Sequence, residues 1–211
     1  MTTSQSRYAE RPYYQWFSDR LDDALEIARA LSVIVNEPNE FSTVEMAAIS
    51  IAPSSLSIAS SIRPLVAEGY TPSARLLLRP LLERTATLDC VVNDKAGQIL
   101  WQDGWKKAKR PSLSKLLSRM DISTDLDPAA FQNLIVNDLN AIIHPDPQGL
   151  FRLQSPTTNG MDVHWLEKHP EDFDAADTVC SAAAMCAVLI SSNLKRAFYN
   201  KIKNVGMSAA N

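Results

Sequence analysis

The sequence predicts an all-α fold, a single-domain helical bundle of six to seven helices over residues 1–211, on the strength of three observations. Apolar residues recur at steps of three and four in nearly every segment, as on one face of a helix. Capping residues and prolines stand where these segments begin and end. Only residues 146–166 lack this pattern, and we expect a short β-hairpin or loop insertion there.

The first two predicted helices have clear starts. Pro12 opens the first, since proline suits the first helical turn, and Asn36 and Pro38 end it. One face of this helix is apolar and consists of Phe17, Leu21, Ala24, Ala28, Leu31 and Val35. Ser42 and Glu45 have the spacing of a capping box for the second helix. Pro53 lies inside that helix and is expected to kink or divide it.

The middle of the chain predicts four further helices. Thr71 as cap and Pro72 in the first turn begin the third, which runs to about Asn93. The others are expected at about 95–109, at 113–120 and from 127 to 144, the last being ended by the proline that follows its final residue.

The insertion at 146–166 is followed by one long final helix. Asn159-Gly160 is a strong turn signal, and short apolar runs flank it. The final helix should run from Pro170 to about Lys203, with a middle rich in Ala, Ser and Cys that lets neighbouring helices approach closely. The polar ends, 1–11 and 205–211, are expected to be flexible.

Composition narrows the function classes. The formal net charge is −3, and the one dense basic cluster is Lys106, Lys107, Lys109 and Arg110, so RNA is a partner that the sequence allows but does not favour. The three cysteines lie in apolar helical runs, which indicates a reducing, cytoplasmic setting. The longest apolar run, 179–190, is too short to span a bilayer, so no membrane partner is expected. No motif predicts a metal or other cofactor.

A row of charged residues on the third predicted helix is the first candidate site. Arg75, Arg79 and Glu83 are spaced four residues apart, so they line one side of the helix, and Arg84 follows. This row has two interpretations. It is either a structural ion-pair row at a helix seam or a site in which arginines bind an anion.

The second candidate site lies at the end of the helix expected at 127–144. Asn140 and His144 are one turn apart and can meet on one face. His144 is either a histidine favoured by the helix dipole or a general acid or base that Asn140 orients. Asp146 is counted with the arginines as a candidate binding residue. We expect Arg79 and Glu83 to lie near Asn140 and His144 in one partly buried polar cluster, because a charged pair on a leucine-rich helix needs partners if it is buried.

Three motifs carry a resemblance over about residues 70–150. They are the segment ARLLLRPLLER at 74–84, Asp-Lys-Ala followed by Trp101 and Trp105, and the ending Leu-Asn-Ala-Ile-Ile-His-Pro-Asp at 139–146. Together they resemble a bacterial family of helical proteins of unknown function that is similar to the HEPN superfamily. That resemblance implies a helical bundle and metal-independent RNA cleavage in toxin or phage-defence systems.

The chain departs from the catalytic pattern of that superfamily, in which an arginine precedes the histidine by four to six intervening residues. The corresponding positions before His144 are Asn137, Asp138 and Leu139. A catalytic arginine would have to come from another helix, as Arg79 or Arg84. We therefore expect a non-enzymatic interaction or regulatory component in a stress or phage-defence pathway, with a protein partner or homo-oligomer. The alternatives are a HEPN-like ribonuclease and a binder of small anionic ligands.

Overall fold

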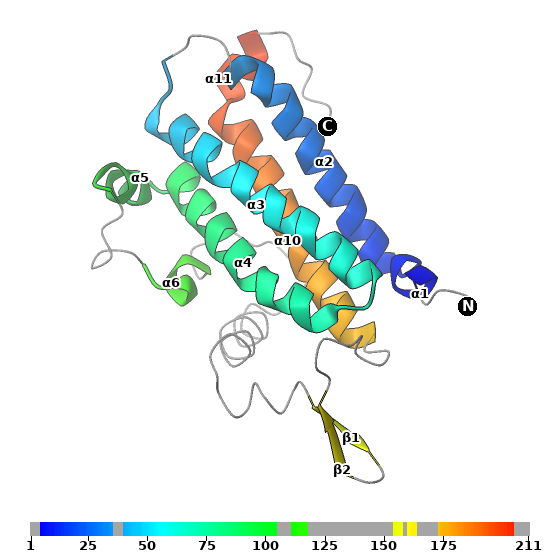
Figure 1. Cartoon of the computed structure of the whole chain (residues 1–211). Coiled ribbons are helices and arrows are strands. Elements are labelled where there is room, and N and C mark those ends of the chain that lie inside the picture. Colours follow the sequence, from blue (N-terminus) through cyan, green and yellow to red (C-terminus); the bar gives the residue numbers. More distant parts are fainter. Residues whose placement is uncertain are drawn as a thin grey trace.

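Four long helices form the body of the molecule, as the sequence predicts for an all-α protein. The computed structural model describes residues 5–35, 40–104, 111–117, 154–157, 160–163 and 173–204. Within them, α2 (Pro12–Val35), α3 (Thr43–Ala67), α4 (Thr71–Asn93) and α10 (Phe173–Ala197) pack lengthwise in one bundle (Figure 1). The described helices number eight, more than the six to seven expected.

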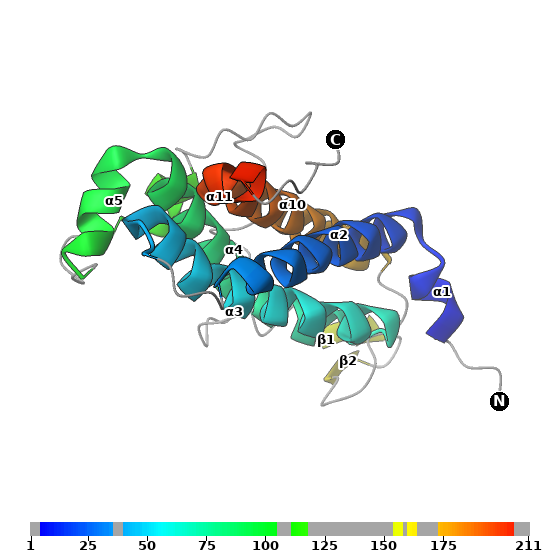
Figure 2. The ribbon, with the colours of Figure 1, turned by 90° about the horizontal axis from the view of Figure 1, so that it is seen from above.

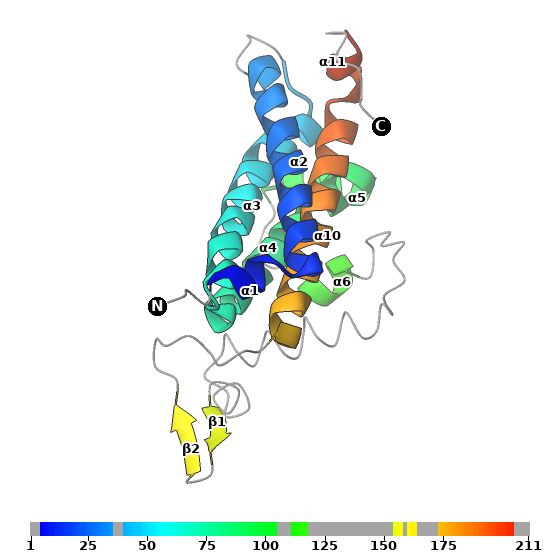
Figure 3. The ribbon, with the colours of Figure 1, turned by 90° about the vertical axis from the view of Figure 1, so that its right-hand side faces the viewer.

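The order of packing places α10 at the centre of the contacts. Helices α2, α3 and α4 follow one another in antiparallel turns, and α10 packs against all three (Figure 2). Helix α10 runs in the same direction as α4, because the chain returns between them to the end of the bundle where α4 begins (Figures 1 and 3).

The core combines large side chains from all four long helices with a run of small side chains on α10. Fully buried large residues include Phe17, Leu21, Ile62, Leu81, Leu88 and Ile190. The middle of α10 buries Ala182, Ala183, Ala184, Cys186 and Ala187. The small residues of α10 therefore serve close packing within the bundle, as the sequence indicated.

Among the described helices, α10 alone is long and apolar enough to cross a membrane by length and composition. The whole helix is longer than the apolar run at 179–190 from which the sequence predicted that no segment spans a bilayer. Of its most apolar 18-residue window, 61% is buried inside the bundle. The core helix of a soluble protein has this character, so the feature is weak evidence for a membrane span.

Helix α3 begins as the sequence predicts but is not divided. The Ser42 side chain accepts from the Glu45 backbone N–H, and the Glu45 side chain accepts from the Ser42 N–H, which completes the capping box. The helix then continues through Pro53 and Pro64 to Ala67. Packing against α4, α10 and α2 offsets the backbone hydrogen bonds that the prolines remove.

Two expected boundaries differ in the structure. Tyr70, not Thr71, is the N-cap of α4, and its side chain makes no capping bond; Thr71 is already helical and buried. The final helix is interrupted by a turn at Phe198, after which α11 (Tyr199–Asn204) follows.

A short helix lies near the N-terminal end, in the segment for which the sequence predicts flexibility. Residues Gln5–Ala9 form α1, and Tyr8 is buried. The Tyr8 ring lies 5.0 Å from the Phe173 ring, and its edge covers Gly69, whose φ of 81° follows the end of α3. An aromatic contact with a residue far along the chain thus holds Tyr8 against the bundle.

Short elements complete the described chain. Helix α6 (Leu113–Leu117) packs on α4 through Leu116 and Leu117. Strands β1 (Gln154–Thr157) and β2 (Gly160–Val163) pair in antiparallel register. The helix expected at 127–144, the rest of the insertion at 146–166 and the tail at 205–211 lie outside the described residues.

Helix α5 (Lys95–Gln102) packs closely against α4 at a glycine. It ends earlier than the expected 95–109, and Gly104 follows with a φ of 82°, a left-handed conformation that suits a helix end. The buried Gly97 lies so close to α4 that an added Cβ would be 2.6 Å from the Cys90 carbonyl oxygen. Only glycine fits at this crossing.

Replacing Gly97 should therefore destabilise the protein. The Gly97→Ala substitution is expected to lower the free energy of unfolding by about 1–3 kcal/mol, because overpacking forces the helices apart. Urea unfolding measures the change, and Ala96→Ser at the exposed neighbouring position is the control. A Gly97→Ala protein as stable as the control would contradict the close approach of α5 and α4.

Candidate functional site

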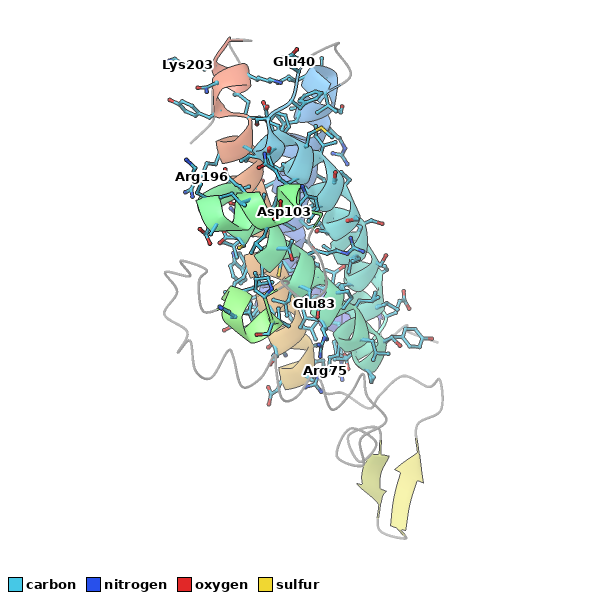
Figure 4. All side chains as sticks on the ribbon, turned by 90° about the vertical axis from the view of Figure 1, so that its left-hand side faces the viewer. Glu40, Arg75, Glu83, Asp103, Arg196 and Lys203 are labelled. Carbon is cyan, nitrogen blue, oxygen red and sulfur yellow. The ribbon has the colours of Figure 1, made fainter. Side chains whose placement is uncertain are left out.

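The charged row on α4 is partly formed as the sequence predicts. Arg79 Nε lies 3.3 Å from Glu83 Oε1, an ion pair of residues four apart. Both side chains are half-buried, with the Arg79 side chain 23% exposed. Arg75, one turn earlier, is also half-buried, and Figure 4 shows it on α4 nearer the start of the helix than Glu83.

Arg79 has a donor that its ion pair leaves unused. Its Nη1 atom is buried and has no hydrogen-bond partner among the described residues. A buried guanidinium N–H without an acceptor costs about 1–3 kcal/mol. An acceptor at this position would stabilise the protein, and an oxyanion supplies acceptor and charge together.

Arg84 does not join this row. It is exposed, and its Nη1 donates to Ser54 Oγ on α3 at 2.7 Å. This hydrogen bond places Arg84 at the α3–α4 seam, and its predicted role in anion binding stays a prediction. Asn140, His144 and Asp146 lie outside the described residues, so the predicted cluster of Arg79 and Glu83 with Asn140 and His144 stays a prediction. The basic cluster at 106–110 also lies outside them.

A second polar cluster, which the sequence did not suggest, joins α4 to α10. Asn193 is 2% exposed; its Nδ2 donates to Asp89 Oδ1 at 3.1 Å, and its Oδ1 accepts from Asn93 Nδ2 at 3.1 Å. Asn93 Nδ2 also donates to Asp89 Oδ1 at 2.8 Å. Arg196 Nη1 donates to Asn93 Oδ1. The members come from positions about 100 residues apart, so no local spacing could reveal them.

A third polar contact closes the end of the bundle where α10 begins. Arg11 Nε donates to Asp177 Oδ1 at 2.7 Å, and Arg11 Nη2 donates to the other carboxylate oxygen. The guanidinium carbon lies 4.8 Å from the centroid of the Phe173 ring. The hydrogen bond to Asp177 raises the pKa of Arg11, which therefore stays charged. This contact ties the start of α2 to the start of α10.

A fourth contact lies at the opposite end. Lys201 on α11 lies 3.2 Å from Glu45 Oε1 at the start of α3. Burial alone would raise the pKa of the Glu45 carboxyl. Hydrogen bonds from the Ser42 backbone and hydroxyl and from the Lys201 ammonium lower this pKa by more than burial raises it. The net pKa lies below its ordinary value, and Glu45 is ionised at neutral pH.

The cysteines are poor candidates for chemistry in this fold. Cys90, Cys180 and Cys186 are buried and unpaired with one another. Burial raises the pKa of the Cys180 and Cys186 thiols to about 12, so both are protonated at neutral pH and are weak nucleophiles. Among the residues that the structure describes, no group of three or more His, Cys, Asp or Glu side chains could hold a metal ion.

Comparison with known protein families, with characterised proteins and with solved structures finds no match for this chain. The site must therefore be judged from its own geometry. Three of the four polar groups join helices and have mutually satisfied partners. The Arg79 side of α4 differs, because a buried donor there has no acceptor within the described part of the chain.

The Asp89–Asn193 contact should contribute measurably to stability. Asn193→Ala removes one donor and one acceptor from a buried carboxylate-amide cluster, and we expect the free energy of unfolding to fall by about 1–3 kcal/mol. Asn200→Ala, an exposed asparagine on α11, is the matched control and should change it by less than about 0.5 kcal/mol. Chemical denaturation of both variants decides; equal stabilities would mean that the cluster is not a structural contact.

Proposed function

We propose that the protein is a non-enzymatic helical interaction or regulatory component that contacts an anionic group of its partner at the Arg79 side of α4. The observation that carries the proposal is the buried Arg79 Nη1 atom, a charged donor without an acceptor among the described residues. Arg75 lies one helical turn away and adds a second positive charge to the same side of the helix.

A comparison with another arginine sharpens this proposal. Arg20 Nε on α2 is also buried without a hydrogen-bond partner, and Arg20 pairs with Asp23 at 3.1 Å. The Arg20 side chain is 43% exposed, however, against 23% for Arg79. A more deeply placed cation with a neighbouring arginine binds an anion more strongly, because water screens the charges less.

The cellular setting follows from the cysteines and the resemblance. Three buried, reduced thiols favour a reducing compartment, so we place the protein in the cytoplasm. The resemblance to HEPN-like bacterial families makes a stress or phage-defence pathway the natural context. A protein partner or a second copy of the chain is then the expected binding partner, and RNA is a less favoured source of the anionic group.

Binding of the anion should depend on Arg79. Inorganic phosphate or sulfate is expected to raise the Tm of the wild-type protein, since a ligand that binds only the folded state stabilises it. Arg79→Met keeps the aliphatic stem, removes the unsatisfied donor and should abolish this rise without lowering the Tm in the absence of the anion. Arg20→Met is the control and should retain the rise. An equal anion effect in the wild type and Arg79→Met, or no effect in either, would refute the proposed site.

The second candidate is a HEPN-like, metal-independent ribonuclease, and the same donor on Arg79 favours it, because phosphoryl transfer needs a cation at the developing charge. His144 would then transfer the proton. His144→Ala should lower the cleavage rate by about 10²–10⁴, and Arg79→Ala by a comparable factor, both with unchanged Tm. RNA cleavage by the purified protein that both substitutions abolish would place this function first. If the purified wild-type protein does not cleave RNA, this function is excluded.

A further inference from the structure

The short C-terminal helix α11 contacts the bundle through the apolar side chain of Ile202 and through one charged residue, Lys201. Lys201 Nζ donates to the Glu40 carbonyl oxygen at 3.0 Å and lies 3.2 Å from Glu45 Oε1. It also lies 4.1 Å from the centroid of the Phe41 ring. All three contacts fall on residues 40–45, which lead into α3 and form its first turn, so this ammonium group supplies the polar contacts between α11 and the start of α3. Figure 4 shows Glu40 and Lys203 at this same end of the bundle.

Glu45 carries two structural roles through one carboxylate. Its Oε2 accepts from the Ser42 N–H at 2.7 Å and so closes the capping box, while its Oε1 faces Lys201. Movement of the carboxylate toward or away from the lysine therefore acts directly on the cap of α3. The Glu45 side chain is 10% exposed, so loss of the lysine leaves a poorly solvated negative charge.

We propose that α11 is a detachable strap, and that its docking through Lys201 and the capping of α3 through Glu45 are one coupled equilibrium. When the Lys201 charge is lost or drawn to another anion, α11 separates and the first turn of α3 loosens with it. The bundle of α2, α3, α4 and α10 stays folded, because the buried apolar residues of α3 begin at Ala47, after this turn.

The first turn of α3 also connects to α5. Gln102 Nε2, at the end of α5, donates to Thr43 Oγ1, the first residue of α3. Loosening of this turn therefore reaches α5, which sits on α4 through Gly97. The strap thus links the C-terminal end of the chain to a helix at the surface of the bundle without a change in the core.

The contacts that Lys201 supplies are individually modest, and only one apolar side chain of α11, Ile202, packs against the core beside them. A partly exposed ion pair is worth about 0.2–1 kcal/mol and a cation–π contact about 0.5–1 kcal/mol or more; together they correspond to about a three- to thirtyfold change in the opening equilibrium. Local opening on this scale is what hydrogen exchange measures.

Hydrogen exchange of the full chain tests the coupling. Lys201→Met keeps the aliphatic stem and removes the charge; it should speed exchange about three- to thirtyfold at the α11 amides and at the Glu45 and Met46 amides, which bond to Ser42. Lys201→Arg should restore wild-type rates. Lys203→Met, at an exposed lysine on the same helix, should leave them unchanged.

Three results would overturn the proposal. The coupling is absent if Lys201→Met speeds exchange in α11 alone and leaves Glu45 and Met46 as in the wild type. The strap is not a separate unit if exchange rises equally in the middle of α4, between Leu81 and Val91. The charge of Lys201 is not the fastener if Lys203→Met has the same effect, or if neither variant changes exchange.

Discussion

The fit of α10 between the other three long helices is the constraint on which the rest of the structure depends. Small side chains let it approach α2, α3 and α4 closely, but each buries little apolar area and so gives little preference for one register over the next. Polar contacts supply that preference. Asn193 can satisfy both of its amide groups only when it lies opposite Asp89 and Asn93, and a shift of one turn would leave its buried side chain without these partners. The same logic explains a buried asparagine that fixes register in a coiled coil.

The two ends of α10 are fastened in the same physical way. At its start, Arg11 combines a bidentate contact to Asp177 with the face of Phe173. Beyond its end, Lys201 combines an ion pair to Glu45 with the face of Phe41. A cation between a carboxylate and an aromatic face gains two attractions for one desolvation cost. The chemistry of the cations separates the two ends: arginine fixes the geometry through two parallel hydrogen bonds, whereas the lysine ammonium is a point charge that other acceptors can also satisfy. The end held by lysine is therefore the one suited to reversible opening.

Local sequence signals predicted the elements but not the contacts between them. The capping box of Ser42 and Glu45 and the Arg79–Glu83 pair each join residues no more than four positions apart, and the apolar face of α2 repeats at steps of three and four. Each of these features is present in the structure. Pro53 does not divide α3 as predicted, because helix propensity is a weak term beside burial on several sides. Tyr8, Asn193 and Lys201 could not be found from spacing, since their partners lie more than 100 residues away. An isolated tyrosine, asparagine or lysine has no local pattern that reveals its partner.

The cationic side chains of the described bundle differ in where they find an acceptor. This difference is the reason for proposing a binding site on the Arg79 side of α4. The cations of Arg11, Arg63 and Lys201 each reach a carboxylate on another element. Arg79 instead pairs within its own helix, through a 3.3 Å contact that occupies Nε and leaves Nη1 buried. An ion pair within one helix adds little to the stability of the protein. The pair with Glu83 therefore does not offset the free-energy cost of burying the unsatisfied Nη1 donor of Arg79. This is the reason for proposing that the Arg79 side of α4 binds an anion: an oxyanion there would satisfy the buried donor and would interact with the charges of Arg75 and Arg79 at once.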